Sequence, residues 1–324
     1  MSVLSQAFSS RLLRGHYADE KPLIPFDYRG TPQEKRRLIS MVNSIASHSQ
    51  TGRAVLQKAA ENGYSLSFGM QSGSYGFTNA EEKRLVLNPC FKDGALLNTL
   101  VHEARHAGQF ANGIETKFGK MALRSEVMVF RAIEADACAT AAFAMLEAEQ
   151  NNIQVKGNLR IGASAETKKL FRRADTKAAL QSAFNDWYDD LAIKQSYEDS
   201  YIIQPMRDAV KNKKEAEMPY HTVVSSDQVI DRICTTPQGC YFDDKNALDN
   251  LRYLDISPAT KAVADRFFEI REMRTGAKPD KSYEDLPINR QLSALHGYFK
   301  GVSYEKASQT PPLFLAQRKT SSGR

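Results

Sequence analysis

Apolar residues along this chain recur mostly at helical spacing, and Gly, Pro and Asn separate the periodic stretches. The first stretch follows Thr31-Pro-Gln-Glu34, which has the form of a capping box with proline in the first helical turn. A second helix is predicted from Arg53 to Glu61, where Asn62-Gly63 ends it. Residues 1–25, before these helices, are expected to be weakly ordered.

A short region of strands is predicted after this helical pair. Residues 64–69 alternate between polar and apolar side chains, as a half-buried strand does. Residues 74–78 and 84–88 flank a polar stretch, 79–83, and this pattern is typical of a β-hairpin. Proline and glycine then punctuate the passage into the next helix.

Two longer helices are predicted next. The first covers residues 94–112, with Asp93 as the expected cap and Asn112-Gly113 as the end. Its apolar stripe consists of Leu96, Leu97, Leu100 and Ala104. The second covers residues 124–146 and is rich in alanine. A strip of small side chains would let it approach another helix closely, namely Ala135, Ala139 and Ala142.

The second half of the chain is predicted to be helical. One stripe there consists of Leu180, Phe184, Trp187 and Leu191, and core packing is the expected role of the single tryptophan. Pro205 should break or kink a helix, and residues 211–219 read as a charged linker. Ser257-Pro258 opens a further helix with Val263, Phe267 and Ile270 facing inward, and Gly276 closes it.

Composition limits the classes of function. The net charge of +6 and pI of about 9.0 are spread along the chain without a basic stripe, so nucleic-acid binding is not expected. No stretch approaches the roughly 18 apolar residues of a membrane span. The four cysteines lack Cys-x-x-Cys spacing and the start lacks a signal-peptide core, so a reducing cytoplasmic location is expected. Export without a cleaved signal and the oligomeric state stay open.

Residues His102-Glu103-Ala-Arg-His106 carry the most specific chemical signal. Residues four apart on a helix share a face, so both imidazoles can reach one metal ion, and neutral imidazole suits zinc. Glu103 lies about 100° round the helix from His102, where a carboxylate can take a proton from an attacking water. The pattern predicts a zinc site with Glu103 as general base.

A catalytic zinc normally has three protein ligands, so a third donor is required. Glu134 and Asp136 stand inside the alanine-rich helix, where unpaired carboxylates would be costly to bury. Glu134 is the preferred third ligand, with Asp136 orienting a histidine and Glu126 as a weaker rival. Alternatively, the two carboxylates pair with Arg131 or Arg105. His221, beside Tyr220, is a minor candidate for stabilising an oxyanion.

Two motifs carry a resemblance over roughly residues 60–150. His102-Glu-Ala-Arg-His-Ala-Gly-Gln109, followed by Arg131-Ala-Ile-Glu-Ala-Asp-Ala-Cys-Ala139, resembles the zincin-type metallopeptidases with a glutamate ligand, the gluzincins. It is most similar to a bacterial family classed as metallopeptidases without an established function. The resemblance implies zinc at His102 and His106, a glutamate ligand from the later helix, and Glu103 as base. The chain departs from the pattern at Ala132, where several gluzincins have the ligand glutamate.

These observations predict an α+β, mostly helical, zincin-like protein with a small sheet packed on the active-site helix. The predicted segments are a weakly ordered 1–25, a catalytic domain at 26–152, a helical domain or lid at 153–310, and a disordered tail at 311–324. The expected activity is zinc-dependent hydrolysis of a peptide or protein substrate. The alternative is a non-proteolytic interaction protein or effector that keeps the fold; an intact Glu103 favours the enzyme. Substrate preference, and endo- or exopeptidase action, stay open.

Overall fold

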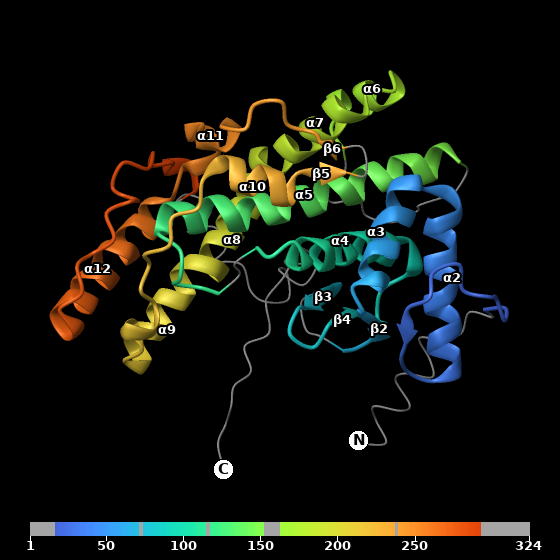
Figure 1. The fold of residues 1–324 in the computed structure, drawn as a ribbon, viewed down its shortest axis with the longest axis horizontal. Helices are drawn as coiled ribbons and strands as arrows, with labels where there is room; N and C mark the ends of the chain where they lie inside the picture. Colours follow the sequence, from blue (N-terminus) through green and yellow to red (C-terminus); the bar gives the residue numbers. More distant parts are fainter. Residues whose placement is uncertain (1–16, 71–73, 115–116, 152–162, 237–238, 293–324) are drawn as a thin grey trace, which may run out of the picture.

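The structure, a computed structural model, describes residues 17–70, 74–114, 117–151, 163–236 and 239–292 (Figure 1). The predicted tail at 311–324 and most of the predicted weakly ordered N-terminal segment lie outside these ranges. From residue 17 onward the chain makes specific contacts: Ile24 belongs to a hydrophobic core, and Tyr17 donates a hydrogen bond to Asp93.

The first two helices form where their polar caps predict. Helix α2 (Pro32–His48) begins at the predicted capping box, in which the Thr31 amide donates to Glu34 and the Glu34 amide donates to Thr31. Helix α3 (Gln50–Glu61) starts three residues earlier than the periodicity predicts. The Ser49 hydroxyl caps it by accepting from the Gly52 amide at 2.7 Å.

The predicted hairpin is confirmed, and it belongs to a four-stranded sheet. The strands are β1 (Asp27–Tyr28), β2 (Ser65–Phe68), β3 (Gly76–Asn79) and β4 (Arg84–Leu87). Their order is β1-β2-β4-β3, with β3 antiparallel to β4 and the other pairings parallel. Strand β3 therefore lies at one edge of the sheet.

Helices α4 (Asp93–Ala111) and α5 (Leu123–Gln150) form the centre of the molecule. Helix α4 packs against α5 on one side and against β3 and β4 on the other (Figure 1). The prediction that Asp93 caps α4 is wrong: Lys92 is the N-cap residue, and no side chain caps this end. The Asp93 carboxylate instead accepts from Arg37 Nε at 2.8 Å and from the Tyr17 hydroxyl at 2.8 Å.

The described residues of the second half are mostly helical, as predicted. Its longer elements are α6 (Ala165–Arg172), α7 (Thr176–Asp189), α8 (Leu191–Glu198), α9 (Gln204–Asn212), α10 (Ser226–Ile233) and α12 (Pro258–Thr275). The shorter elements are the π-helix η1 (Asp199–Ile203), η2 (Glu215–Glu217), β5 (Thr235–Thr236), β6 (Gly239–Cys240), η3 (Ala247–Asp249) and α11 (Leu251–Leu254). Gly276 closes α12 at φ +67°, as predicted.

Two predictions in this half need correction. Leu191 does not continue the stripe of α7, because Asp190 ends α7 and caps α8 by accepting from the Ile193 amide. Residues 211–219 are not a simple charged linker. They include the end of α9 and all of η2, and the buried Glu215 pairs with Arg274 of α12.

Helix α5 contributes to two hydrophobic cores. One contains α2, the sheet and the apolar face of α4, together with Ala141, Ala144 and Met145 of α5. The other joins the first part of α5 to the second half and contains Trp187, which is fully buried, as predicted. Within the described residues, no helix is both long and apolar enough to cross a membrane. All four cysteines are free thiols.

Candidate metal centre

The two imidazoles of the His-Glu-x-x-His run meet on one face of α4. His102 and His106 are four residues apart on the helix, and their rings stand edge to face with centroids 4.6 Å apart. Their Nε2 atoms are separated by 2.9 Å. Both residues are buried, with exposures of 3% and 4%. The structure thus brings together the two nitrogen donors that the sequence predicts.

Helix α5 brings a carboxylate to the same point. Glu134 Oε2 lies 3.3 Å from His102 Nε2 and 3.6 Å from His106 Nε2. One donor atom from each of the three residues lies within 4.8 Å of the others. Across the ranges the structure describes, this is the one cluster of His, Cys, Asp or Glu side chains with metal-binding spacing. The geometry supports Glu134 as the third donor.

Asp136 points to a different set of partners. Its carboxylate accepts from Arg105 Nε at 2.6 Å and Arg105 Nη2 at 3.1 Å. It also accepts from the Tyr241 hydroxyl at 2.8 Å and Gln109 Nε2 at 2.7 Å. Four hydrogen bonds satisfy this fully buried carboxylate without a metal ion. Arg105 therefore pairs with Asp136 and not with Glu134.

The donor set fits a metal ion such as zinc. Two imidazole nitrogens and one carboxylate oxygen are the ligand types zinc prefers, and their number leaves a fourth position open. Glu134 Oε2 is buried and has no hydrogen-bond partner among the described residues. Two Nε2 atoms 2.9 Å apart would face one another with their lone pairs unless a proton or a cation lay between them. A bound cation would satisfy all three atoms at once.

Electrostatics within the cluster point the same way. Burial lowers the pKa of His102. Burial also acts to lower the pKa of His106, but the Glu134 and Glu103 carboxylates and the Gln109 side chain outweigh it and raise that pKa to about 9. Although burial opposes it, the two histidines hold the pKa of Glu134 well below its usual range. The buried Glu134 carboxylate therefore favours a positive charge beside it, either a proton on His106 or a metal cation.

Glu103 is held at the edge strand of the sheet. The Thr78 hydroxyl of β3 lies 2.7 Å from Glu103 Oε2 and 2.8 Å from the Glu103 backbone oxygen. Glu103 Oε1 is buried and accepts no hydrogen bond from a described residue. Burial, partly offset by His106 and Thr78, raises the pKa of Glu103 to about 8. One oxygen of Glu103 thus contacts Thr78, and the other has no partner among the described residues.

Gln109 fixes the tautomer of His106. Gln109 Nε2 donates to Ile133 O at 2.9 Å and to Asp136 Oδ2 at 2.7 Å, and both partners are acceptors only. The Gln109 Oε1 atom must then be the one that lies 2.8 Å from His106 Nδ1, so Nδ1 carries the proton. In the neutral imidazole, the form that binds a metal, this arrangement leaves the lone pair on Nε2, directed at the metal position. Asp136 orients a histidine through Gln109, one residue more distant than predicted.

Besides Thr78, sequence reasoning missed three further residues near the centre. Cys138 Sγ lies 3.6 Å from His102 Nδ1. Tyr197 of α8 is buried, and its hydroxyl has no hydrogen-bond partner among the described residues. Burial and then the nearby Glu134 carboxylate raise the pKa values of Tyr197 and of Tyr201 in η1. Their i, i+4 spacing indicates a shared helix face, but no signal in the sequence shows that this face meets α5.

Other sequence candidates lie elsewhere. Glu126 accepts from the Gly119 amide, two turns and about 12 Å from Glu134 along α5. Arg131 pairs with Glu198 at 2.5 Å. His221 is exposed and its amide donates to the Lys120 backbone oxygen before the start of α5, whereas Glu134 lies about 16 Å further along that helix. The prediction that His221 could stabilise an oxyanion finds no support in this position.

Comparison with known proteins adds one finding. A family model described as "Putative metallopeptidase family" matches residues 17–243. The match spans the chain from before α2 to just beyond β6, and so it contains both helices of the metal centre and Tyr197. No curated protein and no solved structure gives a significant match.

Proposed function

The chain belongs to this "Putative metallopeptidase family", and on that premise we propose that it is a zinc-dependent peptidase. The observation that carries the proposal is the buried triangle of His102, His106 and Glu134, with Glu103 beside it. Two imidazoles, one carboxylate ligand and a second, non-ligand carboxylate are the parts that metal-assisted hydrolysis of a peptide bond requires.

Each residue has a distinct role in the proposed reaction. Bound zinc would lower the pKa of a water molecule toward about 7 and polarise the peptide carbonyl. Glu103 accepts the proton of the attacking water at Oε1, while Thr78 holds Oε2. Glu103 then passes the proton to the leaving amine. Gln109 keeps His106 in the tautomer whose Nε2 faces the metal.

Strand β3 is the proposed docking edge for the substrate. It is the last strand of the four-stranded sheet, and its Thr78 contacts Glu103 directly. An extended peptide can add to a sheet edge through backbone hydrogen bonds, with alternate side chains facing the neighbouring surface. A peptide paired with β3 would bring its backbone alongside α4, which packs on this strand.

One observation favours the alternative, a non-proteolytic protein that keeps the fold. The metal centre is closely covered, since Glu103 has 0% exposure and Glu134 has 6%. A peptidase must open this centre to admit a substrate, whereas a protein that uses the metal only for stability need not. Peptide cleavage by the purified protein separates the two functions.

Metal analysis and cleavage of a peptide library form the test. The protein should carry about one zinc per chain and cleave peptides in a chelator-sensitive manner. Glu103→Gln should retain zinc but lose activity by about a hundredfold or more, because the base is gone. His106→Ala should lose the zinc itself. Glu149→Gln, on the exposed end of α5, is the matched control and should behave as wild type.

Three results would count against the proposal. If the protein fails to bind zinc even after zinc is supplied, the assignment of the metal centre is wrong. Equal cleavage rates for Glu103→Gln and wild type would remove Glu103 as the base. Zinc binding without any cleavage of the library would favour the non-proteolytic alternative.

A further inference from the structure

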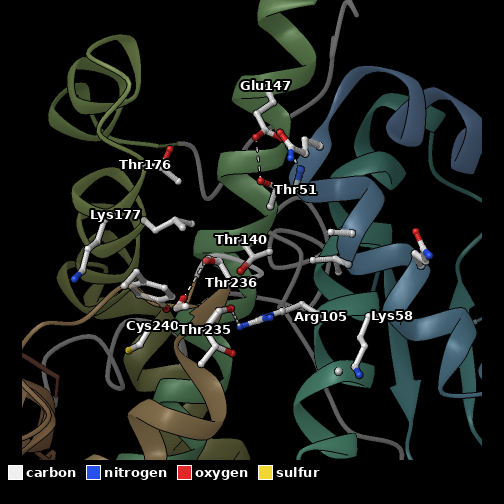
Figure 2. A pocket seen from close by; sticks show the side chains of 18 of the residues that line it. Thr51, Lys58, Arg105, Thr140, Glu147, Thr176, Lys177, Thr235, Thr236 and Cys240 are labelled. Atoms are coloured by element: carbon white, nitrogen blue, oxygen red, sulfur yellow. Dashed lines mark hydrogen bonds between the residues drawn. The ribbon is translucent and has the colours of Figure 1, made fainter.

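The structure contains a cavity of about 820 Å³ (Figure 2). Helices α3 and α7 and the β5–β6 ribbon border it, and residues of α4 and α5 also line it. None of the three metal donors or Glu103 lines it. The volume is that of a site for a small organic molecule. Nothing in the proposed peptidase mechanism uses this space.

Arg105 lines the cavity, and one of its guanidinium nitrogens is unused by the described residues. Its Nε and Nη2 atoms bind Asp136, and Nη2 also donates to the backbone oxygens of Ile233 at 2.5 Å and Thr235 at 2.7 Å. The Nη1 atom donates to none of the described residues. Figure 2 shows Arg105 reaching from α4 toward Thr235. The guanidinium is held on one side by Asp136, so Nη1 is fixed in place before a ligand arrives.

The other lining side chains include a lysine and several threonines. Lys58 of α3 forms no ion pair with a described residue, and its Cγ lies 3.9 Å from the position of a Cβ on Gly108 of α4. Thr140 of α5 lines the cavity, and so do the two threonines of β5. The Lys58 ammonium can donate to an anion without first giving up an ion-pair partner among the described residues, whereas the Thr236 hydroxyl already donates to Gly239 O at 3.0 Å.

The acidic lining residues are already engaged. Glu147 accepts at one oxygen from the Ser49 hydroxyl at 2.6 Å and the Thr51 amide at 2.9 Å, and at the other from the Thr51 hydroxyl at 3.0 Å. Glu61 accepts from Gln57 at 3.0 Å. Both carboxylates therefore have donors within the protein, and an anionic ligand would displace none of these bonds.

We propose that this cavity binds a small anionic ligand, which places a carboxylate or phosphate-type group between Arg105 Nη1 and Lys58. The proposal goes beyond the proposed peptidase activity and does not depend on it. The ligand is a small molecule or a peptide end, because the cavity is too small for a folded partner.

Calorimetric titration of zinc-free protein at low ionic strength tests the proposal. The first probe is sulfate, which represents a tetrahedral anion. The second is an N-acetylated dipeptide with a free carboxylate, compared with the same dipeptide carrying a C-terminal amide. At least one anion should bind saturably and the amide should not. Sulfate alone indicates a phosphate-type ligand, and the dipeptide acid alone indicates a carboxylate.

Two variants locate the binding without breaking the Arg105–Asp136 pair. Gly108→Leu should fill the cavity floor and weaken anion binding by about tenfold or more, while Gly108→Ala leaves most of the space open. Lys58→Glu should weaken binding by a similar factor, since it reverses a charge. Lys211→Glu, on α9, does not line the cavity and should bind as wild type.

The outcomes that would overturn the proposal are specific. One is the absence of saturable binding for both anions. Another is unchanged binding in both Gly108→Leu and Lys58→Glu, with circular dichroism showing that both variants are folded. A third is equal binding of the dipeptide acid and its amide in the absence of sulfate binding. All these measurements use zinc-free protein, so failure of the peptidase proposal would not affect them.

Discussion

Replacing Gln109 with methionine tests how far the metal centre depends on residues that do not touch the metal. Gln109 has 1% exposure, and its amide group makes three hydrogen bonds, to His106, Ile133 and Asp136. Methionine has a similar length and no strong hydrogen-bonding group. The substitution therefore removes the contact that sets the His106 tautomer and still fills the space that the Gln109 side chain occupies.

The expected magnitude follows from these contacts. Loss of a partner that fixes a ligand's orientation typically lowers metal affinity about 10- to 100-fold, which is roughly 1.4–2.7 kcal/mol. Stability should also fall, because methionine leaves two buried acceptors without their donor. One is the Asp136 carboxylate, whose bond is charge-assisted, and the other is the Ile133 backbone oxygen. We expect a loss of about 2–4 kcal/mol in the free energy of unfolding of the zinc-free protein.

A chelator competition titration measures the zinc affinity, and urea unfolding measures the stability. The matched control is Gln195→Met in α8, another glutamine with 1% exposure, whose amide donates to Asp199 at 3.2 Å. That variant should lose stability and keep its zinc affinity. If Gln109→Met binds zinc within about twofold of wild type while remaining folded, the tautomer argument is wrong.

Further predictions concern the same centre. Tyr197→Phe should weaken zinc binding several-fold, because the hydroxyl lies beside Glu134. Tyr188→Phe, which removes another buried hydroxyl without a partner, should not change it. Equal zinc affinities of the two variants would show that Tyr197 does not contribute to the centre. Glu134→Ala should abolish tight zinc binding, and Asp136→Ala should reduce zinc affinity about 10- to 100-fold. A zinc titration in which Asp136→Ala loses more affinity than Glu134→Ala would contradict the ligand assignment. In zinc-free protein the pKa of His106 is raised to about 9, so its contribution to stability is present below about pH 6.5 and is lost as pH rises through 9. The melting temperature of zinc-free protein should therefore fall over this window while zinc affinity rises, and a flat pH profile for both would contradict the assignment.

Local chemistry explains why much of the centre could be predicted from the sequence. The His102 and His106 pair follows from helical geometry alone, and the hairpin from its alternation around a polar turn. Glu134 could be chosen over Asp136 only with help from the family resemblance. The structure adds the physical reason: Arg105, Tyr241 and Gln109 already satisfy Asp136.

Contacts between distant segments could not be predicted. Strand β1 has two residues, too few for a periodic signal, and it forms only by pairing with β2. Tyr197 reaches the centre because α8 belongs to the same core as the first part of α5. The failed cap at Asp93 has the same origin, since Arg37, 56 positions earlier, binds its carboxylate. The predicted domain boundaries stay predictions.

Helix α5 has a consequence for the local opening motions of the protein. It is about 42 Å long by its 28 residues, it carries Glu134, and its side chains belong to both hydrophobic cores. A backbone amide near either end of α5 exchanges its hydrogen for deuterium when the surrounding structure opens. Some of these openings also displace Glu134 from the metal centre, and others leave it in place. Zinc slows only the first kind, by the factor 1 + [Zn]/Kd. If the two cores open as one unit, zinc should protect amides in α2 and in α12 equally, although the metal touches neither helix. Deuterium uptake along the chain would then show how large a part of the protein three side chains hold closed.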